Sequence, residues 1–360
     1  MKIRAVLVLL AAILVLHPYP ARAGEEEVKI KGKPLSTWIT QLTGGNRGLQ
    51  VRAARALSEA PEDVRPKVAE KLIPILKSER ENDRFAAAQT LGDYGSAAKA
   101  AVPNLLPMLE GTQFERNRAA AAKALGQILK DSEPSEEIED VTRKLIAVFG
   151  DKYPDVRREA VKACGMIGPP AKECLKHLVK PLEDNRRGGS QDVPFAQVRA
   201  ASAWTLGRMG PLSKDYIDRL IALMHVDGMA TMIEAIGCIG AVHENVVPNI
   251  VDWLEKKGRD WRHAPKSKMA AWVALTKFGE KSAPAVPFLA RYLRGGVGRE
   301  EPAELFIQWF KLVRAIGPKA KEALPGVQKW VDAKNVPRGW SKEKLEEVKK
   351  EAALTVEKLK

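Results

Sequence analysis

Residues 156–169 read VRREAVKACGMIGP, and residues 198–211 read VRAASAWTLGRMGP. In both segments an Arg lies seven residues before a central Cys or Leu, and a Gly lies four residues after it. The same register recurs along the chain, with one central apolar residue per unit: Leu57, Leu91, Leu125, Cys164, Leu206, Ile236, Leu275 and Val313. These eight residues, named anchors below, are 30 to 42 residues apart. Such a period is typical of repeat proteins.

A glycine follows most anchors at a fixed distance. Six lie four residues after their anchors: Gly95, Gly168, Gly210, Gly240, Gly279 and Gly317. Pro61 and Leu129 take that place in the first and third units. Because glycine adopts the left-handed backbone conformation at low cost, a Gly after an apolar helical run ends a helix. The pattern therefore predicts a helix stop at each of the six.

A second apolar stretch follows each stop. Four copies match closely: VPNLLPML (102–109), VPNIVDWL (247–254), VPFLARYL (286–293) and LPGVQKWV (324–331). Pro at the second position suits a first helical turn, and the apolar residues recur at helical spacing. Each unit is thus expected to be a hairpin of a first and a second helix. Only stacked hairpins bury their apolar faces, so we predict an all-α, right-handed α-solenoid of about eight hairpins.

The repeat resembles HEAT repeats, in particular the short PBS-lyase-type HEAT-like repeats of many bacterial proteins. The resemblance covers residues 35–331 and rests on three features: the Pro near the start of the first helix, the opening DVRREA (155–160) of the second helix, and its Gly stop. It implies that the solenoid serves as a binding surface, because HEAT solenoids are mainly scaffolds with a few enzymes among them.

The N-terminus has the three parts of a secretory signal peptide. Residues 1–4 are basic, residues 5–16 are an apolar run of twelve, and Ala21-Arg22-Ala23 is a cleavage pattern. Twelve residues are too few to span a bilayer as a helix, which takes about twenty. We predict cleavage after Ala23, no membrane span in the mature chain, and a periplasmic or extracellular location. The alternative is an uncleaved membrane anchor.

The rest of the chain is expected to be one continuous domain. A flexible lead-in is predicted at 24–34, the solenoid at 35–331, and a charged amphipathic capping helix within 332–360, with Ser341 at its N-cap.

The chain is strongly basic, with a formal net charge of +14. Removal of Lys2, Arg4 and Arg22 with the signal peptide would lower this to +11. A basic exported protein attracts acidic proteins and anionic envelope polymers. We expect a protein partner or such a polymer, and no nucleic acid, because export would separate the protein from it.

Four arginines lie seven residues before their anchors: Arg84, Arg118, Arg157 and Arg199. Stacking would place them in one column. They could form a cationic stripe for an anionic ligand or a structural ladder, in which each Arg bonds a neighbouring carboxylate or carbonyl. We favour the ladder because a guanidinium donates to several acceptors at once. The polar residues expected beside them are Asp83, Asn117, Asp155 and Gln197.

The aromatic residues follow the repeat. Trp253, Tyr292 and Trp330 share one position in the first helices and are expected in the core. Three tryptophans of the second helices are expected to pack between units, with exposure on the concave face as the alternative: Trp204, Trp272 and Trp309.

Three cysteines, Cys164, Cys174 and Cys238, are too few for a disulfide framework. Cys164 and Cys238 are expected to be buried small hydrophobes. A Cys164–Cys174 bridge is the alternative.

Long spacings locate three insertions between the first and second helices, at 183–197, 256–268 and 294–302. The second is basic and contains a tryptophan, and Arg and Trp are frequent at protein-interface hot spots. We hypothesise that eight insertion residues bind the partner: Lys256, Lys257, Arg259, Trp261, Arg262, His263, Arg186 and Arg187. The acidic linker at 130–140 is expected to be a flexible tether, with a second contact surface as the alternative.

Catalytic patterns are absent from the sequence. The histidines have no zinc-type spacing, and the one His-Glu pair, His243-Glu244, cannot complete a di-iron site built from several such pairs. We predict no catalytic residue, metal or cofactor, and hence a non-enzymatic scaffold. The alternatives are an enzyme or enzyme subunit with a site in the concave groove, like the lyases and hydroxylases built on this repeat, and nucleic-acid binding by the basic face.

The signal peptide gives the first test. Intact-mass measurement of the exported protein should give a chain that begins at Gly24, and fractionation should recover it outside the cytoplasm. A full-length chain in the membrane fraction would support the anchor instead, and a cytoplasmic location would contradict both.

Overall fold

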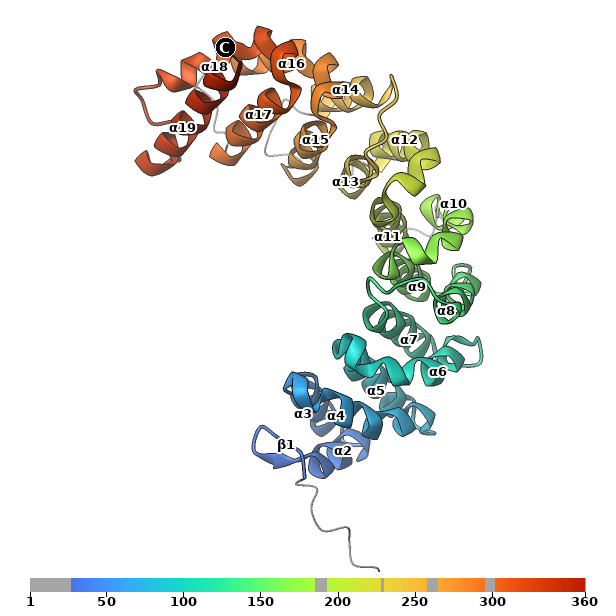
Figure 1. Ribbon diagram of the computed structural model, residues 1–360. Coiled ribbons are helices and arrows are strands. Elements are labelled where there is room, and N and C mark those ends of the chain that lie inside the picture. Colours follow the sequence, from blue (N-terminus) through green and yellow to red (C-terminus); the bar gives the residue numbers. More distant parts are fainter. Residues whose placement is uncertain (1–26, 185–192, 228–229, 258–264, 295–301, 360) are drawn as a thin grey trace, which may run out of the picture.

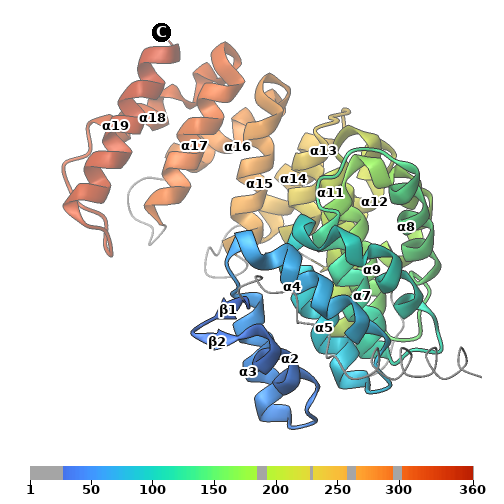
Figure 2. The same cartoon turned by 60° about the horizontal axis from the view of Figure 1, so that its bottom comes forward.

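The computed structural model describes residues 27–184, 193–227, 230–257, 265–294 and 302–359, and these form two layers of helices wound into an open arc (Figure 1). The helices alternate along the chain between an outer and an inner layer, and the second helix of each predicted hairpin lies in the inner, concave layer. Figure 2 shows the same stack turned by 60°, with its N-terminal end forward. The all-α solenoid is therefore confirmed.

The layers have the following members. The inner layer consists of α3 (Arg47–Ser58), α5 (Glu81–Asp93), α7 (Glu115–Ile128), α9 (Pro154–Ile167), α11 (Val193–Met209), α13 (Ala230–Ile239), α15 (Pro265–Phe278), α17 (Ala303–Ile316) and α19 (Lys342–Leu359). The outer layer consists of α2 (Leu35–Thr43), α4 (Arg65–Leu72), α6 (Val102–Leu105), α8 (Glu136–Ala147), α10 (Val179–Leu182), α12 (Ile217–Asp227), α14 (Val246–Lys257), α16 (Val286–Arg294) and α18 (Leu324–Val331).

Short 3₁₀ helices link or extend these elements: η1 (Glu62–Val64), η2 (Ile73–Lys77), η3 (Gly95–Ala101), η4 (Leu106–Leu109), η5 (Pro169–His177), η6 (Gly210–Tyr216), η7 (Gly279–Ala285) and η8 (Gly317–Ala323). The helix stops are confirmed, because the six predicted glycines have φ between 57° and 82°. Where the sequence suggested plain linkers, five of the six stops lead directly into a 3₁₀ turn.

The two ends of the described chain differ from the prediction. Residues 29–34 form a small antiparallel hairpin of β1 (Lys29–Ile30) and β2 (Lys33–Pro34). The indole of Trp38 donates a 2.8 Å hydrogen bond to the carbonyl of Ile30, which is buried. The prediction of a flexible lead-in is therefore wrong for residues 27–34, because this hairpin packs over the N-terminal end of the core.

The C-terminal helix begins where predicted, since the Ser341 hydroxyl accepts a hydrogen bond from the N–H of Lys344. It packs against both α17 and α18 in line with the inner layer. Helix α19 is thus the second helix of a further hairpin. Among the described residues, no helix is long and apolar enough to cross a membrane.

A column of glycines sets the spacing of the inner layer. The residue after the anchor is glycine in five consecutive units: Gly92, Gly126, Gly165, Gly207 and Gly237. A methyl group on Gly126 would lie 2.5 Å from the Cα of Ala163 in the next inner helix, and one on Gly237 would lie 3.0 Å from the Cα of Ala274. The backbones of successive inner helices therefore approach more closely than any side chain would allow.

The predicted arginine column forms a bonded ladder along the turns that join outer to inner helices. Each arginine bonds carbonyls of the turn before its own helix: Arg84 those of Ser78 and Glu79, Arg118 that of Gln113, Arg157 those of Asp151 and Lys152, and Arg199 that of Asp184. At the same position of α3, the side chain of Gln50 bonds Asp83 at 2.8 Å.

Two aspartates join successive arginines. Asp151 accepts from the Arg118 guanidinium with both carboxylate oxygens, at 2.8 and 3.0 Å, while its carbonyl accepts from Arg157. Asp184 links Arg157 and Arg199 in a similar way, but one carboxylate oxygen, Oδ2, accepts both bonds from Arg157, at 2.9 and 2.6 Å, and its carbonyl accepts from Arg199. The sequence did not indicate these partners: Asp155 and Gln197 bond Arg158 instead. The linking acids lie in the turns, where the repeat has no conserved spacing to reveal them.

The C-terminal units are held by packed aromatic rings. Trp272 contacts Trp309 with ring centroids 5.6 Å apart, Phe306 lies 4.7 Å from Trp309 and 4.3 Å from Trp330, and Trp340 extends the cluster. Four tryptophans predicted to pack inside the fold are buried, namely Trp253, Trp272, Trp309 and Trp330, whereas Tyr292 and Trp204 are partly exposed. The rings give this end bulkier core side chains than the Ala-rich N-terminal units.

Cys164 and Cys174 are free thiols in the core, and burial raises the pKa of the Cys164 thiol.

The glycine column predicts a stability difference. Gly126→Ala should destabilise the protein by about 1–3 kcal/mol, although alanine favours helices, because its methyl group meets the Ala163 backbone. Gly150→Ala is the control, since a methyl group there meets nothing within 4 Å, and it should change stability by less than about 0.5 kcal/mol. Chemical denaturation of the three proteins measures this; equal stabilities would contradict the close contact.

The ladder predicts that removing a buried arginine lowers the stability of the fold more than removing an exposed one. Arg157→Met leaves the Asp184 carboxylate buried without its partner and should cost about 3 kcal/mol or more. Arg143→Met removes an exposed pair with Asp140 and should cost less than about 1 kcal/mol. Similar losses in thermal unfolding would show that the ladder adds no specific stability.

Candidate functional site

The concave side contains a groove of about 480 Å³ over three successive inner helices, α11, α13 and α15. Every residue that lines it belongs to these helices, and none comes from the outer layer. A volume of this size is within the range of protein sites that enclose a side chain or a small ligand. Figure 1 places these helices near the middle of the arc, facing its open side.

The floor of the groove consists of small residues. Gly207 and Gly237 belong to the glycine column, and Ala235, Ala270 and Ala274 lie beside them. The close approach of the inner helices demands small side chains here, so no long side chain rises from the floor. The packing constraint that spaces the solenoid therefore also gives the groove a floor of small residues, most of which are themselves buried.

One tryptophan closes the groove toward the N-terminus. Trp204 lies two residues before its anchor on α11, and its ring covers Gly165 of α9, where a methyl group would lie 2.6 Å from the ring. The equivalent residues of the next two helices are Glu234 and Val273. Because neither is as large as tryptophan, the glycines beside them are not covered in the same way, and the groove opens at this point.

The rim of the groove is polar. The Lys277 ammonium donates to the Cys238 sulfur at 3.3 Å, and Glu234 is exposed. Arg208 bonds the Gly165 carbonyl at 3.2 Å and the Asp131 carboxylate. Cys238 is exposed, so the prediction that it is buried is wrong. It lies two residues after its anchor, on the open side of α13, whereas Cys164 is itself an anchor.

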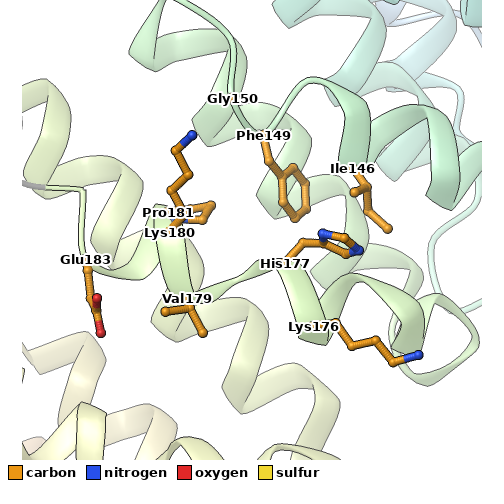
Figure 3. A pocket seen from close by; sticks show the side chains of 9 residues that line it. All are labelled: Ile146, Phe149, Gly150, Lys176, His177, Val179, Lys180, Pro181 and Glu183. Atoms are coloured by element: carbon orange, nitrogen blue, oxygen red, sulfur yellow. The ribbon is translucent and has the colours of Figure 1, made fainter.

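A second pocket, of about 570 Å³, lies on the convex side (Figure 3). It lies between the end of α8 and the segment formed by η5 and α10. The rings of Phe149 and His177 face each other in Figure 3, with Lys180 on one side and Lys176 farther out. Helix α10 has only four residues, so the outer layer is thin here.

Two charged side chains of the convex pocket already form ion pairs. Lys176 pairs with Glu173 at 3.1 Å, and Glu183 pairs with Arg219. The pocket depends on long exposed side chains, whereas the concave groove has a floor fixed by backbone packing. We therefore take the concave groove as the candidate site.

The predicted partner-binding residues fall mostly outside the described chain. Arg186, Arg187, Arg259, Trp261, Arg262 and His263 lie outside it, as does the side chain of Lys257. Lys256 is described, and it pairs with Asp252 on α14 at 2.8 Å. The hypothesis about these insertions thus stays a prediction.

The groove itself was missed, although a signal for it exists. In the sequence, five consecutive anchors are followed directly by glycine, and this second glycine position could have indicated a bare inner face.

Metal ligands do not gather in the described residues, where no group of three or more His, Cys, Asp or Glu side chains could hold a metal ion. His243 pairs with Asp218 at 3.2 Å.

Comparisons with known proteins agree with this architecture. The family model for HEAT repeats matches residues 35–126 and 102–193, and the PBS lyase HEAT-like repeat matches residues 198–225. Curated proteins give no significant match.

Solved structures show the same fold at low sequence identity. Importin beta superposes with a TM-score of 0.65 at 14% identity, over 98% of this chain and 54% of its own. Yeast importin-beta gives 0.60 at 11% identity, over 91% and 45%. Kap121p gives 0.57 at 14% identity, over 90% and 38%. The chain spans about half the length of these proteins or less, and the likeness concerns the fold alone.

Family models match the repeats from residue 35 to residue 225, and the stacked hairpins continue to residue 359. The chain is therefore a HEAT-repeat protein.

Proposed function

We propose that this protein is a non-enzymatic, exported scaffold that binds an extended segment of a partner protein along its concave face. The observation that carries the proposal is the groove over α11, α13 and α15, with its floor of glycine and alanine. Such a floor accepts an apolar side chain of a bound segment without displacing any side chain of the protein. Export rests on the sequence pattern of residues 1–23.

The rim indicates what the bound segment would carry next to that apolar side chain. Arg208 of α11 and Lys277 of α15 border the groove at the same position of their helices, with Cys238 of α13 between them, and Glu234 borders it at another position. A segment with an acidic residue near its apolar side chain could pair with Lys277 and still avoid Glu234. An anionic polymer could use the charges of Lys277 and Arg208 but not the apolar floor.

A lyase-like enzyme subunit is the second candidate. The match to the PBS lyase HEAT-like repeat at residues 198–225 favours it, together with the exposed Cys238 thiol beside the Lys277 ammonium. A nucleophilic thiol and a cation in one groove could serve group transfer. Cys238→Ser separates the candidates: a scaffold keeps its binding, whereas chemistry through this thiol would be lost.

A groove-filling substitution tests the scaffold proposal. Val273→Trp places a tryptophan on α15 at the position that Trp204 occupies on α11. On α11 that ring covers Gly165 of the preceding inner helix. Peptides selected on the wild-type protein from a display library should bind this variant at least about tenfold more weakly, because the ring occupies the floor. Fluorescence anisotropy measures the affinities.

Gln89→Trp is the matched control. Gln89 lies two residues before its anchor on α5, as Val273 does on α15, and it is exposed and far from the groove. The added tryptophan should therefore leave both peptide affinity and melting temperature unchanged. If the selected peptides bind Val273→Trp as tightly as wild type, the groove is not the binding site. Loss of binding in both variants would show that the tryptophan acts on the fold rather than on the groove.

A further inference from the structure

The acidic linker between α7 and α8 is an ordered part of the solenoid edge. Residues 130–140 contain one cation, Lys130, and six acidic residues, in a chain whose net charge is +14. The expectation of a flexible tether is wrong for this segment. Asp131 has a left-handed φ of 51°, its N–H donates to the Met166 carbonyl at 3.0 Å, and its carboxylate bonds Arg208.

These bonds hold the linker against two further units. Met166 belongs to α9 and Arg208 to α11, so Asp131 connects three consecutive hairpins. At the other end of the linker, the Ser135 hydroxyl caps α8 by accepting from the N–H of Ile138. The backbone of the linker is thus fixed at both ends, and the side chains between them are presented in a defined geometry.

A pocket of about 580 Å³ lies between this linker and the turns that follow α9 and α11. Its apolar lining comes from Pro134 on the linker, Ile167 at the end of α9, Pro169 and Pro170 at the start of η5, and Leu212 in η6. Leu212 is 49% exposed, so its side chain is available to a bound segment. The proline rings are rigid, so the pocket is formed before any partner arrives.

The charge around the pocket is negative. Glu133 and Glu139 line it and are exposed, and Asp131 lines it while bonded to Arg208. Lys172 is the one basic residue in the lining. This is a local acidic surface on a basic protein, and its potential attracts cations that the rest of the surface repels.

We propose that this edge pocket binds a basic segment of a partner protein, with an aliphatic or proline side chain against Leu212 and the prolines and Lys or Arg beside Glu133 and Glu139. Charge complementarity selects the occupant: an acidic segment would face the carboxylates, and a purely apolar one would leave them unpaired. The pocket is lined by other residues than the concave groove, and the two sites are joined by one ion pair, because Asp131 of the pocket bonds Arg208 on the groove rim.

A peptide pair tests the proposal on the full-length mature protein. The probe is a labelled nine-residue peptide in which Lys and Arg alternate with Leu and Pro; its counterpart has Glu in place of each Lys and Arg. Anisotropy should show binding of the basic peptide only. Leu212→Ser should weaken that binding about tenfold, because it removes an apolar contact. Glu139→Lys should weaken it at least about fivefold, since it reverses a charge in the lining.

Glu136→Lys is the matched control for the charge reversal. Glu136 is in the same first turn of α8 as Glu139, but it does not line the pocket, so its reversal should change the affinity less than twofold. If Glu136→Lys and Glu139→Lys weaken binding equally, the peptide is held by general charge attraction and not by the pocket, and the proposal is overturned. Full binding by Leu212→Ser, or no binding of the basic peptide at all, would also overturn it.

A last measurement separates a partner from a second copy of this chain. Sedimentation of the protein alone should show a monomer at concentrations that bind the peptide. Self-association that Glu139→Lys abolishes would identify a second copy as the occupant and contradict the assignment to a separate partner.

Discussion

The contact between a glycine of one inner helix and an alanine of the next is the constraint on which the rest of this molecule depends. Because no side chain fits between Gly126 and the backbone of Ala163, the inner helices pack closely. The bulkier outer helices and their 3₁₀ turns stand farther from the centre of curvature, so the stack bends into an arc (Figure 1). The same absence of side chains gives the concave groove its floor.

Two different interactions hold neighbouring units together. In the N-terminal half, Asp151 and Asp184 each bind one arginine through the carboxylate and the next through the carbonyl, so the three units that carry Arg118, Arg157 and Arg199 are tied together. In the C-terminal half, packed rings around Trp309 replace this ladder. The acidic linker adds a third connection, because Asp131 reaches Arg208 across two hairpins.

The sequence determines the repeat but not the surfaces that depend on it. Anchors, glycine stops and the arginine column were predictable, because each recurs at a fixed spacing that helical packing imposes. The acids that complete the ladder were not, since Asp151 and Asp184 lie in turns of variable length. The exposure of Cys238 was also missed, because an apolar neighbourhood in sequence does not show which side of α13 faces the concave space. The groove emerges only when three helices are stacked.

The interruption of the ladder has a mechanical consequence. Seven residues before Ile236, where other units carry an arginine, the sequence has Met229, whose side chain has no donor for a neighbouring turn. Lys268 takes that position in the next unit and is buried. In the sequence the arginines at this position therefore end at Arg199, and the described aromatic contacts begin at Trp272 of α15. Two kinds of bond thus resist a change of curvature, hydrogen bonds of arginine before α13 and ring packing after it, and the groove lies where one gives way to the other.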